Sequence, residues 1–132
     1  GYSGNIGEIE MKVKVNIENC ERYIDKFATE LAVRLDWQFE KSVSDSDVCL
    51  SPLGYTSIYT LCTNYSLIHE AEKQVIEKVG KLEYGIKLVN LVGELPKMIT
   101  VEVALKCAMA SASQRLTAML LALGVEELEV SE

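Results

Sequence analysis

Hydrophobic and polar residues alternate without interruption between Glu8 and Glu18. The apolar positions in this segment are Ile9, Met11, Val13, Val15 and Ile17. A period of two predicts a β-strand with one face buried and the other in water. Because only one face is apolar, the pattern is typical of a strand in an antiparallel or mixed sheet.

After Asn19, which can cap a helix, the apolar spacing lengthens to three and four residues. The recurring positions are Ile24, Phe27, Ala28, Leu31 and Leu35, and they predict a helix from about 20 to 36. Trp37 and Phe39 then alternate with polar residues and predict a short strand. The polar segment 42–47 predicts a loop.

Residues 48–64 are rich in β-forming residues and are interrupted by a turn, Ser51-Pro52-Leu53-Gly54. Beyond the turn, one strand face is expected to carry Tyr55, Ser57, Tyr59 and Leu61. Ser66 is placed to cap a second helix, which Gly80 ends. The apolar stripe of that helix is Ile68, Ala71, Val75 and Val79. Alternation from Leu82 to Leu88 predicts another strand, which reaches about residue 92.

The resulting order over residues 8–92 is β-α-β-β-α-β, which predicts an α+β fold: a two-layer sandwich with a ferredoxin-like core. Residues 93–132 are expected to add a strand/helix/strand extension to a single domain spanning 1–132. Residues 1–7 are expected to be flexible, and their Gly-rich sequence fits either a tag remnant or a natural end. The ferredoxin-like arrangement hosts many unrelated functions, so it says little about activity.

Residues 98–105 fit two patterns at once. Alternate residues from Ile99 to Leu105 are apolar, as in a strand, yet Met98, Val101 and Leu105 are also spaced as on a helix from Pro96 to Leu123. We favour the strand, because the segment is β-branched and such a helix would far exceed the average of about 11–12 residues. An apolar helix follows from about 106 to 123, and Glu127 to Val130 predict an edge strand.

This last helix is apolar on more than one face. Its large apolar residues are Leu116, Met119, Leu120, Leu121 and Leu123. A helix of this kind is buried on more than one side, whereas the sheet of a two-layer domain covers one side only. The remaining cover is either another helix of the chain or a partner subunit. We predict a homo-oligomer formed through the helix that contains Ala108, Ala112, Leu116 and Met119.

The chain has 132 residues and a net charge of −7, from 20 acidic and 13 basic side chains. This charge argues against bulk attraction to phosphate backbones or anionic lipid, so we expect neither a nucleic-acid nor a membrane partner. No stretch approaches the roughly 18 apolar residues needed to span a bilayer. Residues 1–10 lack the pattern of a signal peptide, and we therefore expect a cytoplasmic protein.

No CxxC pair occurs among the four cysteines, Cys20, Cys49, Cys62 and Cys107. The spacing supports neither a zinc ribbon nor a redox motif, and reduced, buried thiols are the expected state. Phosphate-binding, zinc-protease and nucleophile-elbow motifs are absent from the sequence. No cofactor and no metal site are predicted.

Three residues are candidates for binding a ligand: Tyr55, Tyr59 and His69. Tyrosines among small hydroxyl residues suit a recognition surface, although a partly buried strand with its phenols at the rim has the same pattern. His69 is the only histidine and can act as a general base or metal ligand, or lie solvated in the first turn of its helix.

Two hypotheses about function follow. The first is a self-associating α+β module that binds a small ligand or a protein partner without catalysis. The second is a small metabolic enzyme with a pocket between subunits, in which His69 is the general acid/base. His69 in a concave site beside Tyr or Glu would favour the enzyme, and an isolated, exposed His69 would favour the binding module.

Overall fold

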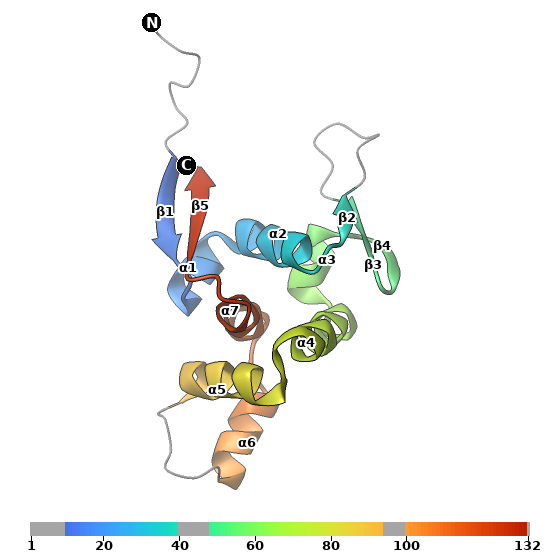
Figure 1. Cartoon of the computed structure of the whole chain (residues 1–132). Helices are drawn as coiled ribbons and strands as arrows, with labels where there is room; N and C mark the ends of the chain where they lie inside the picture. The colour runs from blue at the N-terminus through green and yellow to red at the C-terminus, as the bar shows by residue number, and fades with distance from the viewer. Residues whose placement is uncertain (1–9, 40–47, 94–99, 132) are drawn as a thin grey trace, which may run out of the picture.

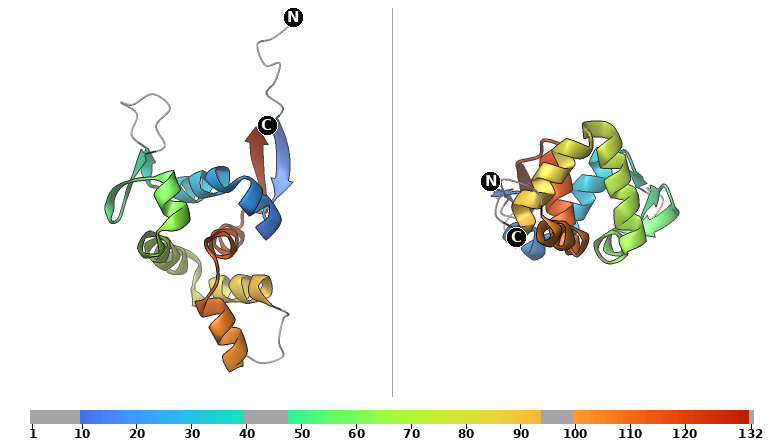
Figure 2. Two further views of the ribbon diagram at one scale, coloured as in Figure 1. Left: turned by 180° about the vertical axis from the view of Figure 1, so that it is seen from behind. Right: turned by 90° about the horizontal axis from the view of Figure 1, so that it is seen from below.

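A computed structural model describes residues 10–39, 48–93 and 100–131 of the chain. In these ranges helices surround one central helix, and two small antiparallel sheets lie on opposite sides of the molecule (Figure 1). Figure 2 shows the same separation of the two sheets from behind and from below. The mixed helix and sheet content confirms the α+β class. The ferredoxin-like order is not confirmed, because the strands form separate sheets of two and three.

The first sheet is a ribbon of β1 (Glu10–Lys14) and β5 (Glu127–Ser131), which pair antiparallel with Val13 opposite Leu128. The predicted C-terminal strand is confirmed, and the predicted alternation is confirmed in part: Val13 and Val15 are buried and Lys12 and Lys14 are exposed, but Met11 is 39% exposed. The strand ends before residue 18, because the Asn16 side chain accepts a hydrogen bond from the Asn19 amide and begins a helix. The expectations for residues 1–9 lie outside the described residues.

The helix predicted over 20–36 is two helices, α1 (Ile17–Arg22) and α2 (Ile24–Arg34). They are separated by Tyr23, whose φ of −123° and ψ of 44° are not helical. The buried side of α2 carries Phe27, Ala28, Leu31 and Ala32, close to the predicted stripe. The strand predicted at Trp37–Phe39 is confirmed in part as β2 (Gln38–Phe39), and the loop predicted at 42–47 lies outside the described residues.

The second sheet has the order β2-β3-β4, with β3 (Val48–Ser51) and β4 (Gly54–Ser57) joined by the predicted turn. Gly54 has a φ of +108°, which L side chains rarely adopt, and the Ser51 hydroxyl donates to the Gly54 carbonyl at 2.8 Å. The strand was expected to continue to Leu61, and this is wrong. Ser57 accepts from the Thr60 amide at 3.2 Å and begins α3 (Ile58–Thr63).

The second predicted helix is α4 (Tyr65–Val79), which ends at Gly80 as expected, with a φ of +95°. Its N-cap is Asn64 and not Ser66, because the Asn64 side chain accepts from the Leu67 amide at 3.1 Å. The strand predicted over 82–92 is wrong. These residues form α5 (Lys81–Val92), which buries Tyr84 and Leu88, four residues apart on one face.

The strand that we favoured over 98–105 is also wrong in its described part. Thr100 accepts from the Val103 amide at 3.2 Å and begins α6 (Val101–Ala108). The apolar helix expected over 106–123 is α7 (Ala112–Ala122), separated from α6 by Met109 to Ser111. Ser111 and Gln114 form a capping box at the start of α7. Gly124, with a φ of +86°, follows its end.

The central helix α7 is covered by this chain's own helices. It contacts α1, α2, α3, α4 and α5, and Leu116, Met119 and Leu120 are fully buried. These residues are therefore inaccessible to a second copy of the folded chain, and the argument for self-association through this helix is removed. Ala108, which was predicted to share the interface, lies exposed on α6. None of the helices that the structure describes is long and apolar enough to cross a membrane.

Candidate functional site

The three candidate residues lie on successive elements but do not converge on one point. Tyr55 is on β4 and Tyr59 on α3, with 69% and 66% of their surfaces exposed. His69 is on α4, one turn after Tyr65, and its ring centroid lies 6.4 Å from that of Tyr65. The prediction that Tyr55 and Tyr59 share one face of a strand is wrong, because Tyr59 is helical.

A hollow of about 200 Å³ lies where β4 meets the junction of α3 and α4. Its lining consists of Ser51, Leu53, Gly54, Tyr55, Thr56, Thr60, Asn64, Ser66 and Leu67. Three consecutive residues of β4 line it, although successive side chains of a strand point to opposite faces. The hollow therefore runs along an edge of β4.

The hollow is lined by residues without charge. Residues 48–68 contain no Asp, Glu, Lys or Arg, so every side chain of the lining is neutral or apolar. Leu67 is buried and Leu53 is exposed, while Thr56, Asn64 and Ser66 supply hydroxyl and amide groups. Such a surface can enclose an apolar group and hydrogen-bond neutral polar groups beside it.

Tyr59 and Tyr65 do not line the hollow, but each is adjacent in the sequence to a residue that does. We use the name tyrosine surface for these two residues together with Leu53 and Tyr55, because each of the four is at least 50% exposed within residues 53–65. Neither Tyr59 nor His69 lines this hollow, and neither lines the hollows of about 460 and 390 Å³ elsewhere on the described residues. Of the three candidate residues, the structure thus places only Tyr55 at the hollow.

His69 is part of a second arrangement, a cluster of polar side chains that begins at the surface and continues inward. Its Nδ1 lies 2.8 Å from Glu72 Oε1, and 61% of the His69 side chain is exposed. The Glu72 carboxylate is buried, and it accepts hydrogen bonds from the Tyr84 hydroxyl and from Arg115 Nη1. His69 is therefore neither isolated nor in a described hollow.

Arg115 holds this cluster together from α7. Its Nε donates to the Ala110 carbonyl at 3.0 Å, and its Nη2 donates to the carbonyls of Ala108 and Cys107 at 2.8 and 3.3 Å. The guanidinium carbon also lies 5.8 Å from the Tyr65 ring centroid. Arg115 thus ties the end of α6 and the start of α7 to α4, and through Glu72 to α5.

Burial raises the pKa of Tyr84 well above the ordinary phenol value, and the hydrogen bond to Glu72 and the charge of Glu72 raise it further. Tyr84 therefore remains a hydrogen-bond donor to the carboxylate throughout the physiological range. Every buried side-chain nitrogen and oxygen in the described residues has a hydrogen-bond partner. The cluster is satisfied internally, which is the condition under which buried polar groups stabilise a fold.

Neither a family model, nor a curated protein, nor a solved structure was found that matches this chain.

The sequence prediction missed Glu72, Tyr84 and Arg115, although two of them had a detectable signal. Glu72 lies four residues after Ile68, within the apolar stripe of its helix. Arg115 is the one charged residue between Lys106 and Glu126. Opposite charges on two apolar helix faces are a signal of a buried pair, because each charge needs a partner when it is removed from water.

The four cysteines are reduced, and Cys20, Cys49 and Cys62 are buried, as predicted. Cys107 is partly accessible. Burial raises the pKa of the Cys20, Cys62 and Cys107 thiols, which disfavours the nucleophilic thiolate. Among the described residues, no three His, Cys, Asp or Glu side chains are grouped so that they could hold a metal ion.

Proposed function

We propose that this chain is a binding module that recognises a protein partner through the tyrosine surface. The observation that carries the proposal is the exposure of Tyr55, Tyr59 and Tyr65 on a segment without a charged residue. Protein interfaces are enriched in tyrosine and depleted in charge at their centres. A tyrosine also contributes a large, rigid contact area with a hydrogen-bonding tip.

The hollow indicates which partner chemistry fits. Its volume of about 200 Å³ is below the range of roughly 300–1,000 Å³ typical of pockets that enclose a whole small ligand. It suits one apolar side chain of a partner, with Leu67 beneath it and hydroxyl groups around it. The matching partner segment is uncharged, carries a leucine- or methionine-sized anchor and presents backbone or amide groups to the hydroxyls.

A display library of random eight-residue peptides tests this proposal. Selection on the wild-type chain is expected to enrich uncharged peptides with one aliphatic anchor. Tyr55→Ser and Thr60→Trp should weaken the binding of these peptides at least about tenfold, because the first removes contact area and the second fills the hollow. Met109→Ser is the matched control, since it removes an apolar side chain that is 81% exposed on α6. Peptides that bind all four proteins equally, or the absence of enrichment, would refute the proposal.

A second candidate function is acid–base chemistry at His69. The observation that favours it is the 2.8 Å contact of Nδ1 with Glu72, which orients the ring as carboxylates orient catalytic histidines. Hydrolysis of p-nitrophenyl acetate is a direct probe of a nucleophilic or basic imidazole. The wild type should exceed both His69→Ala and Glu72→Gln in rate, and equal rates for the wild type and Glu72→Gln would exclude a role for the pair.

A further inference from the structure

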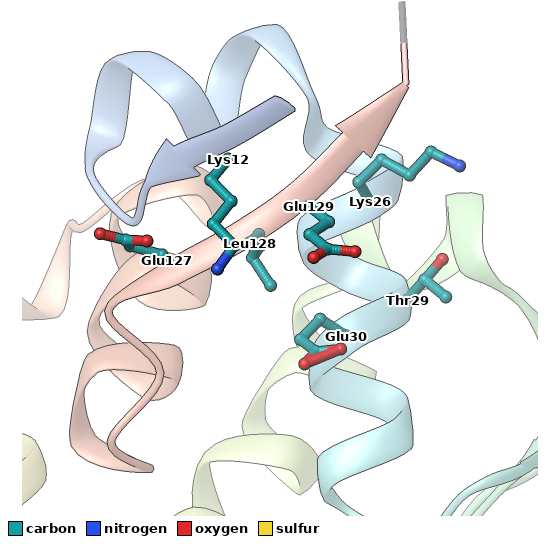
Figure 3. A pocket seen from close by; sticks show the side chains of 7 residues that line it. All are labelled: Lys12, Lys26, Thr29, Glu30, Glu127, Leu128 and Glu129. Atoms are coloured by element: carbon teal, nitrogen blue, oxygen red, sulfur yellow. The ribbon is translucent and has the colours of Figure 1, made fainter. Parts of the chain in front are cut away.

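A groove of about 460 Å³ lies between the β1–β5 ribbon and α2. Figure 3 shows β5 between β1 and α2, with side chains from all three elements around the groove. The lining residues are Lys12, Lys26, Thr29, Glu30, Glu127, Leu128 and Glu129. Three carboxylates and two ammonium groups thus surround one apolar side chain, that of Leu128.

The edge of β5 that faces away from β1 carries backbone groups without a partner among the described residues. The Val15 amide donates to the Glu126 carbonyl at 2.9 Å, which fixes the phase of the antiparallel ladder. Alternate residues of β5, Leu128 and Val130, then bond to β1, and the amides and carbonyls of Glu127, Glu129 and Ser131 point away from it. The Lys14 carbonyl of β1 likewise points outward and accepts from Asn19 Nδ2 at 2.8 Å.

The pairing of β1 with β5 shows which sequence complements this edge. Lys12 lies opposite Glu129 and Lys14 opposite Glu127, with Val13 opposite Leu128 between them. The two side chains of β1 that lie opposite these glutamates are basic, the third side chain on that face is Glu10 opposite Ser131, and the alternate side chains, Met11 and Val13, are apolar. A strand of the same alternation on the free edge would place its basic side chains beside Glu127 and Glu129 and an apolar side chain beside Leu128.

We infer that the free edge of β5 binds an extended segment of a partner protein in which basic and apolar residues alternate, and that this segment lies as a third strand in the groove against α2. Backbone hydrogen bonds supply affinity in this mode of binding, and alternate side chains supply specificity. A second copy of β5 is a poor occupant, because it would bring glutamates opposite glutamates. This surface is separate from the tyrosine surface, which lies by the other sheet.

An acetylated, amidated peptide Lys-Val-Lys-Val-Lys-Val is the probe, and amide hydrogen exchange followed by NMR is the measurement. Exchange of the Glu127 and Glu129 amides is expected to slow by at least about tenfold when the peptide is saturating, because these amides gain backbone acceptors. The matched peptide Glu-Val-Glu-Val-Glu-Val should not bind. The basic peptide with alternate backbone nitrogens methylated on its bonding edge should bind at least about fivefold more weakly, the size expected from the loss of one or more hydrogen bonds.

Two proline variants locate the site. Glu129→Pro removes an amide on the free edge of β5 and should weaken peptide binding at least about fivefold, whereas Lys14→Pro removes an outward amide on the opposite edge of the ribbon and should leave binding unchanged. Glu129→Gln separates the loss of charge from the loss of the amide, and far-ultraviolet circular dichroism establishes that each variant is folded. Equal binding of the methylated peptide, or equal exchange of the Glu129 amide with and without the peptide, would overturn the inference.

Discussion

Arg115 and Glu72 are 43 residues apart in the sequence, and Arg115 Nη1 donates to both carboxylate oxygens of Glu72, at 3.2 and 3.0 Å. Only 8% and 9% of the two side chains are exposed. The pair joins α7 to α4, and its remaining hydrogen bonds reach α5 and the turn before α7. The contribution of the pair to the stability of the fold therefore depends on all of its hydrogen-bond partners and not on the ion pair alone.

Arg115→Met should lower the free energy of unfolding by about 3–5 kcal/mol, because it leaves the buried Glu72 carboxylate without its counter-charge. Urea denaturation followed by circular dichroism measures the change. Arg34→Met is the matched control, since Arg34 pairs with Glu30 at 3.2 Å on the surface, where such a pair contributes less than about 1 kcal/mol.

The double variant Glu72→Gln/Arg115→Met distinguishes a coupled pair from two independent losses. Removing the carboxylate charge as well should cost less than the sum of the two single changes, because no unpaired charge is then left buried. Additive costs would contradict the view that the two groups act together.

Tyr84→Phe tests the third member of the cluster. The change removes one donor to a buried carboxylate and should lower the free energy of unfolding by about 1.5–3 kcal/mol. Tyr59→Phe removes a hydroxyl from an exposed tyrosine and should change stability by less than about 0.5 kcal/mol. Thermal and urea unfolding of the two variants provide the comparison, and similar stabilities would contradict the role assigned to Tyr84.

The segment from Leu82 to Leu88 shows why part of the fold could not be read from the sequence. Its apolar residues occupy every second position, as in a strand. Every second one of these apolar residues is four positions from the last, and residues four apart share a face of a helix. The structure buries Tyr84 with Leu88 and exposes Leu82 and Ile86. Over seven positions the strand and helix periods overlap, and burial against α7 decides between them.

Where the spacing of the apolar residues fitted only one period, the sequence alone predicted the element. The ribbon strand at Met11–Val13, the stripe of α2 and the end of α4 at Gly80 were all predicted. The extension of the strand past Ser57 failed because a serine cap, local to Thr60, begins a helix within β-branched residues. At the candidate site, Tyr55 and Tyr59 were found by residue type, but the Glu72–Arg115 pair depends on a contact between distant helices.

Burial of α7 within the chain predicts how a core substitution will behave. Leu116→Ala should lower the free energy of unfolding by about 2–5 kcal/mol, because it opens a cavity at a fully buried position. The loss should be independent of protein concentration, since Leu116 is covered by helices of the same chain. Leu105→Ala, at a position 57% exposed on α6, should cost less than about 0.5 kcal/mol. A midpoint for Leu116→Ala that rises with protein concentration would show that a second chain covers this helix.

The raised pKa of the Cys62 thiol leads us to expect that the protein loses stability in alkaline solution. Burial, with smaller effects of Asp25 and Cys20, raises the pKa of its thiol from 9.0 to about 12, and the thiol donates to the Ile58 carbonyl at 3.3 Å. Between these pH values the unfolded chain releases this proton while the folded chain retains it. The stabilisation is therefore complete below pH 9 and declines as the pH rises, by up to about 1.4 kcal/mol per pH unit for this group.

Urea unfolding at several pH values from 8 to 11, under a reducing agent, measures this slope. Cys62→Ala should remove the contribution of one group, so that its stability falls less steeply with pH than that of the wild type. Leu61→Ala is the matched control: it also removes buried volume from α3, but it should lower stability by the same amount at every pH. Because a loss of buried volume does not involve a proton, only the thiol can account for a difference in slope between the Cys62→Ala and Leu61→Ala variants. Parallel slopes for the wild type and Cys62→Ala would contradict a raised pKa at Cys62.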